Sequence, residues 1–178
     1  MTMVTLEPFA TLSAVLMFSA LMVYAGLSDL KAFKIPNWLI GLLVASYALL
    51  APLAGFGLRE IGFSIAVGAI VLVIAFALFS FGWIGGGDAK LGAATALWLG
   101  ADHTLGYLFY TTLLGGGLAI GLLMFRSALI PVSWHRWAWI NRLHAAETGI
   151  PYGVAMAAAA LIVFKETPWM GSLLTKGG

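Results

Sequence analysis

Two aspartates differ from the other acidic residues of this sequence in their surroundings. Five of the seven acidic residues fall in predicted tails or turns, where water can surround them: Glu7, Glu60, Asp102, Glu147 and Glu166. Asp29 and Asp88 instead lie directly against long apolar segments. A carboxylate at membrane depth is costly and usually faces the interior of a helix bundle or a wet cavity. These two residues are therefore the candidates for chemistry.

A pair of carboxyl groups can hydrolyse a peptide bond. When two of them lie close together they cannot both ionise readily, so they share one proton. The ionised partner takes a proton from water, the water attacks the peptide carbonyl, and the protonated partner donates to the developing oxyanion. Position alone leaves two plainer interpretations open. Asp29 can be a solvated helix end beside Lys31, and Asp88 can be the N-cap of the following helix.

The composition indicates a protein that is embedded in a membrane. Of the 178 residues, 62% are hydrophobic and only 9% are charged, against about 45–50% and about 25% in soluble domains. The mean hydropathy of +1.01 also excludes a disordered chain, which needs low hydrophobicity and high charge. The net charge of +2 is small and scattered, which argues against nucleic acid as a partner.

The sequence offers no thiols and no set of metal ligands. It contains no cysteine, which excludes disulfides, thiol nucleophiles and cysteine-based zinc or iron–sulfur sites. His135 and His144 are nine residues apart, which is not a metal-ligand spacing. We therefore expect neither a metal nor a cofactor.

We expect an all-α integral membrane protein, a single domain over residues 1–178 that forms a bundle of about six transmembrane helices. The expected spans are about 9–27, 38–56, 61–81, 89–101, 105–125 and 150–164. The fourth would reach only about 20 Å of a ~30 Å membrane core. It therefore either starts in the preceding glycine loop or lies in a protein-lined recess. Asp102, His103 and Thr104 are expected to form a turn, and residues 165–178 to fray.

The longest polar region, residues 126–149, is predicted to lie at the cytoplasmic membrane surface. Within it Trp134, Trp137 and Ile140 share one helical face. Aromatic and arginine side chains favour the headgroup boundary, so we expect an interfacial helix here.

The placement of basic residues predicts which side of the membrane each loop faces. If the spans alternate, one side receives six basic residues: Lys31, Lys34, Lys90, Arg126, Arg136 and Arg142. The other side receives three: Arg59, Lys165 and Lys176. Because cytoplasmic loops carry the excess of Lys and Arg, we place the N-terminus outside and both candidate aspartates at the cytoplasmic face.

Three motifs in this sequence resemble those of a known family. Residues 85–91, Gly-Gly-Gly-Asp-Ala-Lys-Leu, resemble the GxGD signature of type IV prepilin peptidases and the related archaeal preflagellin peptidases. Residues 29–37 resemble the first aspartate motif of that family, in which Ile-Pro-Asn begins six residues after the aspartate. Residues 150–155, Ile-Pro-Tyr-Gly-Val-Ala, resemble a third feature near the start of the last helix. The three occur in the family order.

The resemblance implies an aspartic endopeptidase of the prokaryotic inner membrane. Its partner would be a pilin-like precursor, from which it removes a short basic leader at the cytoplasmic face, and its surroundings the lipid bilayer. Asp29 and Asp88 map onto the two catalytic aspartates. Lys90 either holds a substrate carboxylate or marks the cytoplasmic face. The residues expected to shape the site are Gly85, Gly86, Gly87, Pro36, Asn37, Pro151, Tyr152 and Gly153.

The sequence also departs from the larger bacterial branch of that family. That branch has an N-terminal insert with a four-cysteine zinc site and a second activity, N-methylation of the new pilin terminus. This chain starts at its first span and has no cysteine, so we expect no methylation. It resembles the short Tad-type peptidases that process Flp pilins, or a minimal archaeal relative. Association of the chain with copies of itself is left open.

Two other functions would use the same features differently. A proton- or cation-coupled transporter component could use Asp29 and Asp88 as its ion site, although the inverted repeat that would favour transport is not visible in the sequence. A structural subunit of a secretion complex would need neither aspartate. Cleavage of a precursor distinguishes the peptidase from both.

Overall fold

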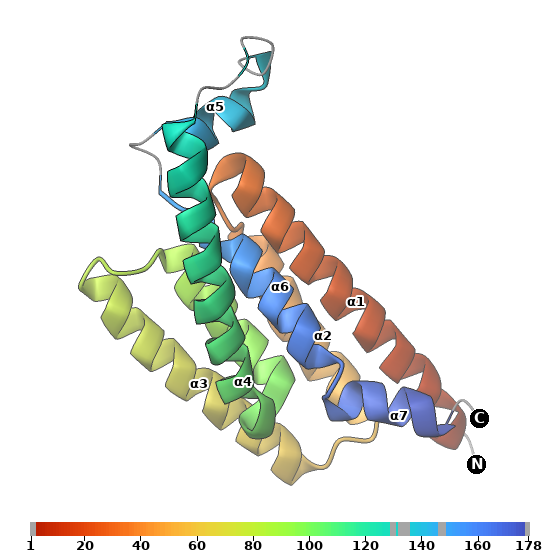
Figure 1. Ribbon diagram of the computed structural model, residues 1–178. Helices are drawn as coiled ribbons and strands as arrows, with labels where there is room; N and C mark the ends of the chain where they lie inside the picture. Colours follow the sequence, from red (N-terminus) through yellow and green to blue (C-terminus); the bar gives the residue numbers. More distant parts are fainter. Residues whose placement is uncertain (1–2, 129–130, 132–135, 146–148, 177–178) are drawn as a thin grey trace.

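The computed structural model describes residues 3–128, 131, 136–145 and 149–176, and these form an all-helical protein (Figure 1). The helices of this described part are α1 (Met3–Ala32), α2 (Asn37–Leu53), α3 (Leu58–Ser80), α4 (Gly86–Ser127), α5 (Ala138–His144), α6 (Tyr152–Phe164) and α7 (Pro168–Lys176). No strand occurs among the same residues. The expected all-α fold is therefore confirmed.

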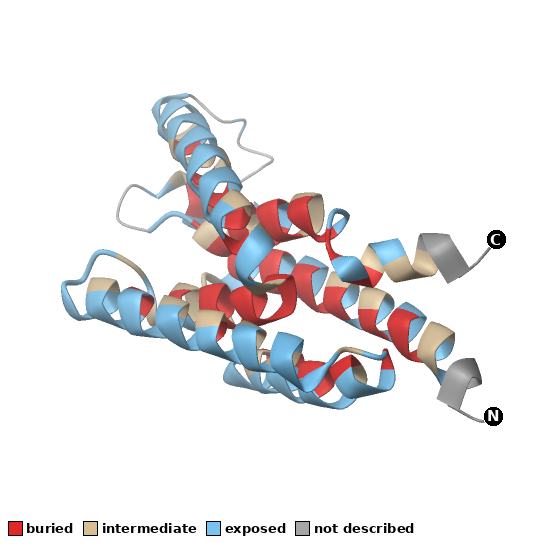
Figure 2. Ribbon diagram, turned by 90° about the horizontal axis from the view of Figure 1, so that it is seen from below, coloured by how far each residue is buried: buried red, intermediate tan, exposed pale blue. Residues whose placement is uncertain are grey.

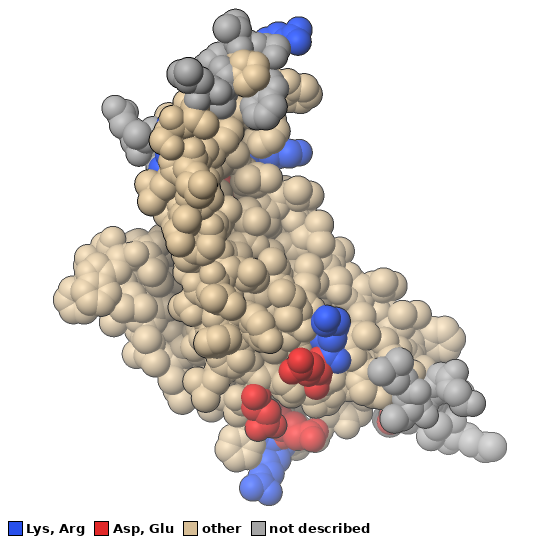
Figure 3. All heavy atoms as spheres, viewed as in Figure 1, with Lys and Arg blue, Asp and Glu red and all other residues tan. Residues whose placement is uncertain are grey.

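The surface of the bundle is that of a membrane protein. Among the described residues, α1 over Leu6–Ala32, α3 and α4 are long and apolar enough to cross a membrane, while α2 and α6 are apolar but shorter. Large apolar side chains cover the outside; Val73 of α3, for example, is 69% exposed, and exposed residues line the outer sides of the helices in Figure 2. Charged side chains gather near the two ends of the face in Figure 3. The count of six spans stays a prediction.

Helix α4 is broken at Gly100 and turns back on itself. Gly100 has φ 71° and ψ −176° inside an otherwise helical run, and only glycine adopts such a positive φ without strain. The second half of α4 then runs back along the first (Figure 1). The hydroxyl of Thr104 donates to the Gly100 carbonyl at 2.6 Å, which links the first turn of the second half to the break. The turn predicted at Asp102, His103 and Thr104 is wrong, because the chain reverses at Gly100 and these three residues are helical.

The first half of α4 lies inside the protein rather than against lipid. Every residue from 89 to 99 is buried except Lys90. A helix this short can serve at membrane depth because neighbouring helices cover it and its backbone is satisfied internally. This agrees with the protein-lined recess, one of the two explanations offered for the short fourth segment.

The tail predicted to fray is instead helical as far as Lys176, and the start of this helix packs on the core. Helix α7 buries Trp169, which is 1% exposed. Its indole N–H donates to the Trp98 carbonyl at 3.1 Å, and its ring stacks on Phe56 at 4.4 Å between centroids. The prediction was wrong because the partners of Trp169 lie far away in the sequence.

The described part of the predicted interfacial segment contains one short helix, α5. Arg126, near the end of α4, stabilises this region. Its guanidinium donates hydrogen bonds to the Leu143 carbonyl at 2.8 Å and to the Gly149 carbonyl at 2.9 Å. Trp134 and His135 lie outside the described residues, so one of the three residues of the predicted apolar face is not described. The location of α5 at a membrane surface stays a prediction.

Candidate active site

Asp29 is held by the start of helix α6. The residue lies in the last turns of α1, is 6% exposed, and accepts a 2.7 Å hydrogen bond at Oδ2 from the backbone N–H of Gly153. A buried carboxylate without such a donor would be strongly disfavoured. Helix α1 ends soon afterwards because Phe33 enters the left-handed region, with φ 52°. Asp29 is therefore not the solvated helix end that its position beside Lys31 allowed.

Asp88 lies at the third position of α4, whose N-cap residue is Gly85. Its half-buried carboxylate points back toward Gly85, where a Cβ would lie 2.9 Å from Oδ2. Asp88 is therefore not the N-cap residue that its position in the sequence allowed. The charge of Asp29 acts on Asp88, so α1 and α4 bring the two carboxyl groups near each other.

Two of the glycines expected to shape the site let other parts of the protein approach. A Cβ on Gly86 would lie 3.2 Å from the ring of Phe79 in α3, and a Cβ on Gly87 would lie 3.3 Å from the Cβ of Ile35. Such contacts are tighter than ordinary van der Waals packing. The small size of these residues therefore lets the Ile35 segment and α3 pack against the start of α4.

Two other glycines leave room for the carboxyl groups themselves. A Cβ on Gly85 would lie 2.9 Å from Oδ2 of Asp88, and a Cβ on Gly153 would lie 2.9 Å from Oδ2 of Asp29. Neither carboxyl group could keep its position beside an alanine. Each aspartate can therefore keep its position only because the glycine beside it has no side chain.

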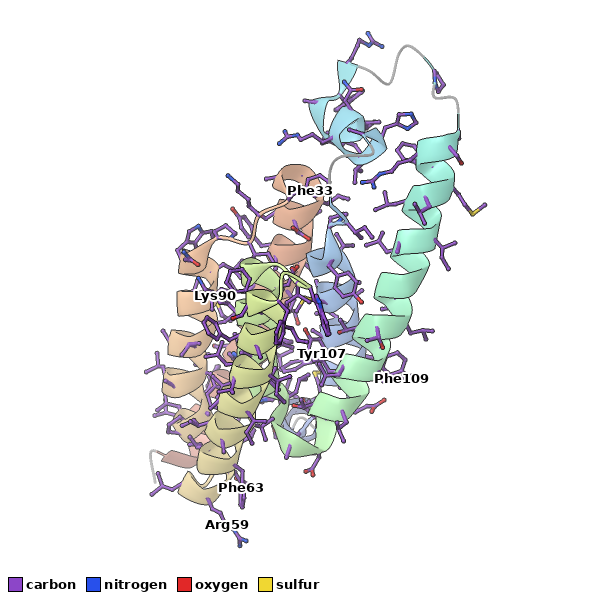
Figure 4. The ribbon with its side chains drawn as sticks, turned by 90° about the vertical axis from the view of Figure 1, so that its left-hand side faces the viewer. Phe33, Arg59, Phe63, Lys90, Tyr107 and Phe109 are labelled. Atoms are coloured by element: carbon purple, nitrogen blue, oxygen red, sulfur yellow. The ribbon has the colours of Figure 1, made fainter. Side chains whose placement is uncertain are left out.

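The segment after Asp29 is attached to the start of α4. Pro36 is the N-cap of α2, with φ −65°, and the next residue, Asn37, accepts a 3.0 Å hydrogen bond at Oδ1 from Nζ of Lys90. Figure 4 shows Lys90 and Phe33 toward one end of the bundle and Arg59 at the other. Lys90 therefore joins the Ile-Pro-Asn motif to the motif that contains Asp88.

Sequence reasoning missed a line of residues on the second half of α4. Tyr107, Thr111 and Gly115 are spaced four apart and all buried, with Tyr107 inside the bundle (Figure 4). The Tyr107 hydroxyl faces those of Thr95 and Thr111, and within the described chain neither Tyr107 nor Thr111 has a hydrogen-bond partner of normal geometry. The sequence signal that could have revealed this line is the four-residue spacing of the hydroxyl side chains of Tyr107 and Thr111 in an apolar helix.

The described chain also forms an apolar cavity of about 290 Å³. It lies between the end of α1, the second half of α4, and α5. Its lining includes Leu30 and Pro151, which are direct neighbours of Asp29 and Tyr152 in the sequence. Its lining is apolar and contains neither aspartate.

In the described part of the chain, no three His, Asp or Glu side chains come together as a metal site would require. The chemistry of the donor groups at the site is that of two carboxyl groups, backbone N–H groups and tyrosine hydroxyls. Such a set suits proton transfer and hydrogen bonding around a reacting carbonyl.

Comparison with known families gives one match. Residues 16–120, more than half of the chain, match the type IV leader peptidase family. The match contains Asp29, the Ile-Pro-Asn segment and Asp88, but it ends before α6, so the third motif rests on its own resemblance and on the Gly153 hydrogen bond. Comparisons with curated proteins and with solved structures found no match. Because the family match covers most of the bundle, the chain belongs to the type IV leader peptidase family.

Proposed function

We propose that this protein is an aspartic leader peptidase in which Asp29 and Asp88 activate the attacking water. The observation that carries the proposal is that α1 and α4, each supplying one motif aspartate, bring two carboxyl groups close enough for their charges to interact. One of them is buried and oriented by the Gly153 N–H. Family membership supplies the reaction class.

The proposed reaction needs only these groups and water. The ionised carboxylate takes one proton from water as the water oxygen bonds to the carbonyl carbon of the scissile peptide. The protonated carboxyl donates its proton toward the carbonyl oxygen, so the charge that develops there is stabilised. The C–N bond then breaks as the nitrogen takes a proton from the pair. One hydroxyl of the tetrahedral intermediate returns its proton to the pair as the new carboxyl group forms, so the pair again holds one shared proton.

The proposed substrate is a pilin-like precursor, of the Flp type that short family members process, whose basic leader is removed at the cytoplasmic face of the inner membrane. The excess of Lys and Arg in the loops near Asp29 and Asp88 supports this sidedness and an outside N-terminus. Lys90 is engaged by Asn37, which supports a role in joining the two motifs. We expect no N-methylation of the product.

The test is co-expression with a candidate precursor, followed by mass spectrometry of the pilin. Cleavage is expected to reduce the mass by that of the leader and to leave an unmodified N-terminus. Asp29→Asn and Asp88→Asn should abolish it, whereas Asp102→Asn, which changes an exposed carboxylate of α4, should not. An intact precursor with the wild-type enzyme, or full cleavage by either aspartate variant, would contradict the proposal.

A further inference from the structure

Tyr152 occupies a notch that only glycine leaves open. It is the first residue of α6, directly before the Gly153 that holds Asp29. A Cβ placed on Gly115, in the second half of α4, would overlap the ring carbon Cζ and the hydroxyl oxygen of Tyr152. The tip of this tyrosine therefore lies against the bare backbone of α4.

The notch continues the buried line Tyr107, Thr111 and Gly115 on α4. This line is the side of the helix that faces the protein, since Gly116 and Gly117 beside it are exposed and have nothing within 4 Å of an added Cβ. At Gly115 the line changes from hydroxyl side chains to bare backbone. The space left at this position is filled by the tip of Tyr152.

The position of Tyr152 relates it to both carboxyl groups. Its hydroxyl lies close enough to Asp88 for that charge to act on it, and its neighbour in the sequence donates to Asp29. The start of α6 thus places the Gly153 N–H beside Asp29 and the Tyr152 hydroxyl within reach of the Asp88 charge. A phenol offers a hydrogen-bond donor without adding a second charge to a site that already holds two carboxyl groups.

We propose that the Tyr152 hydroxyl is a further hydrogen-bonding group of the active site and that Gly115 is the positioning residue that makes room for it. In the reaction, the O–H of Tyr152 donates to the oxygen of the scissile carbonyl as it gains negative charge. No bond other than this hydrogen bond forms, and the proton stays on the phenol. This inference rests on the proposed peptidase function and adds a residue pair to it.

The test compares two variants that affect the hydroxyl in different ways. Tyr152→Phe removes only the oxygen, and Gly115→Ala leaves the oxygen but displaces it. A donor that acts mainly in the transition state is worth about 10²-fold in kcat, and its loss leaves KM nearly unchanged. We expect Tyr152→Phe to show this loss and Gly115→Ala to lose at least as much, because the added Cβ would also overlap the ring carbons at the start of α6. Gly116→Ala and Gly117→Ala are the matched controls and should cleave normally.

Three results would overturn the inference. The first is normal kcat in Tyr152→Phe, an isosteric change that leaves folding intact. The second is normal cleavage by Gly115→Ala, since the position of the Tyr152 hydroxyl would then not matter to the reaction. The third is an equal loss in the Gly116 or Gly117 variants. Asp29→Asn and Asp88→Asn are measured in parallel: if they stay active, the peptidase proposal itself fails, whereas inactive aspartate variants beside a fully active Tyr152→Phe reject only this inference.

Discussion

The backbone N–H of Gly153 donates to Oδ2 of Asp29 across 2.7 Å, although 124 residues separate the two in the sequence. This hydrogen bond joins the last turns of α1 to the start of α6. Because the donor is a backbone group at a helix start, its direction is set by the position of α6 rather than by a side-chain rotamer. The orientation of the buried carboxyl group therefore depends on the packing of α6 against α1.

The first prediction concerns Gly153→Ala. The added methyl group would lie 2.9 Å from Oδ2 and 3.0 Å from Cβ of Asp29, so either the carboxyl group or α6 must move. A displacement of about 1 Å can cost ~10²-fold in rate, and we expect a loss of cleavage of that order in a precursor assay. The control is Gly41→Ala in α2, which meets nothing within 4 Å and should cleave normally. Normal activity of Gly153→Ala would show that the position of Asp29 is not critical.

The second prediction distinguishes two roles for Lys90. If its hydrogen bond to Asn37 joins the two aspartate motifs, Lys90→Ala and Asn37→Ala should reduce cleavage to a similar extent and their effects should not add. If Lys90 instead holds a substrate carboxylate, Lys90→Ala should raise KM while Asn37→Ala leaves it unchanged. Measuring kcat and KM for both variants and their combination decides between the roles, and we expect the first pattern.

The third prediction concerns the attachment of α7. Trp169→Ala removes a buried ring and the hydrogen bond to the Trp98 carbonyl. Large buried aromatic side chains typically contribute about 3–5 kcal/mol, so we expect a marked fall in the thermal unfolding temperature in detergent. Trp83→Ala, which removes a ring that is 74% exposed, is the control and should unfold near the wild-type temperature. Equal effects of the two changes would contradict the folded tail.

The fourth prediction tests the sidedness of the site. The chain has no cysteine, so a single cysteine can report which side of the membrane a position faces. Both Lys34 and Glu60 are exposed, and we expect Lys34→Cys to resist a membrane-impermeant thiol reagent in intact cells while Glu60→Cys reacts. Permeabilised cells provide the control, because both positions should then react. The opposite labelling pattern would reverse the topology.

The two aspartates could be predicted from the sequence because the signals for them are local. Each lies in a short motif beside an apolar run, and such a motif can be seen without knowing what packs against it. The position of the break in α4 was harder to predict from the sequence. A polar triplet at Asp102 suggested the turn, but the reversal requires a positive φ, and Gly100 is the residue that adopts one.

The parts of the site that depend on helix register could not be predicted. Gly115 matters because the tip of Tyr152 lies against it, which requires both the reversal of α4 and the placement of α6. The buried tail depends in the same way on the pairing of Trp169 with Trp98. Contacts of this kind join residues that are distant in the sequence, and hydropathy carries no information about them.

The last prediction is that Asp29 and Asp88 act as one unit. Each would supply half of a pair that shares a proton, so neither has a working partner when the other is lost. We therefore expect Asp29→Asn, Asp88→Asn and the double variant to fall to a common residual rate, since groups that act as a unit have strongly non-additive effects. General acid–base catalysis is commonly worth ~10²–10⁴-fold, and each single loss should be at least that large.

These substitutions should leave the fold intact, which keeps the measurement interpretable. Asparagine has nearly the volume of aspartate, and its side-chain oxygen can still accept the hydrogen bond that Gly153 donates to Asp29. It also removes a charge from a poorly hydrated position, so purified yield and thermal stability should stay near wild type or rise. Two outcomes would contradict the pair. A single variant with near-normal cleavage would remove that residue from the reaction. A double variant whose loss equals the product of the two single losses would mean that the carboxyl groups contribute independently rather than through one shared proton.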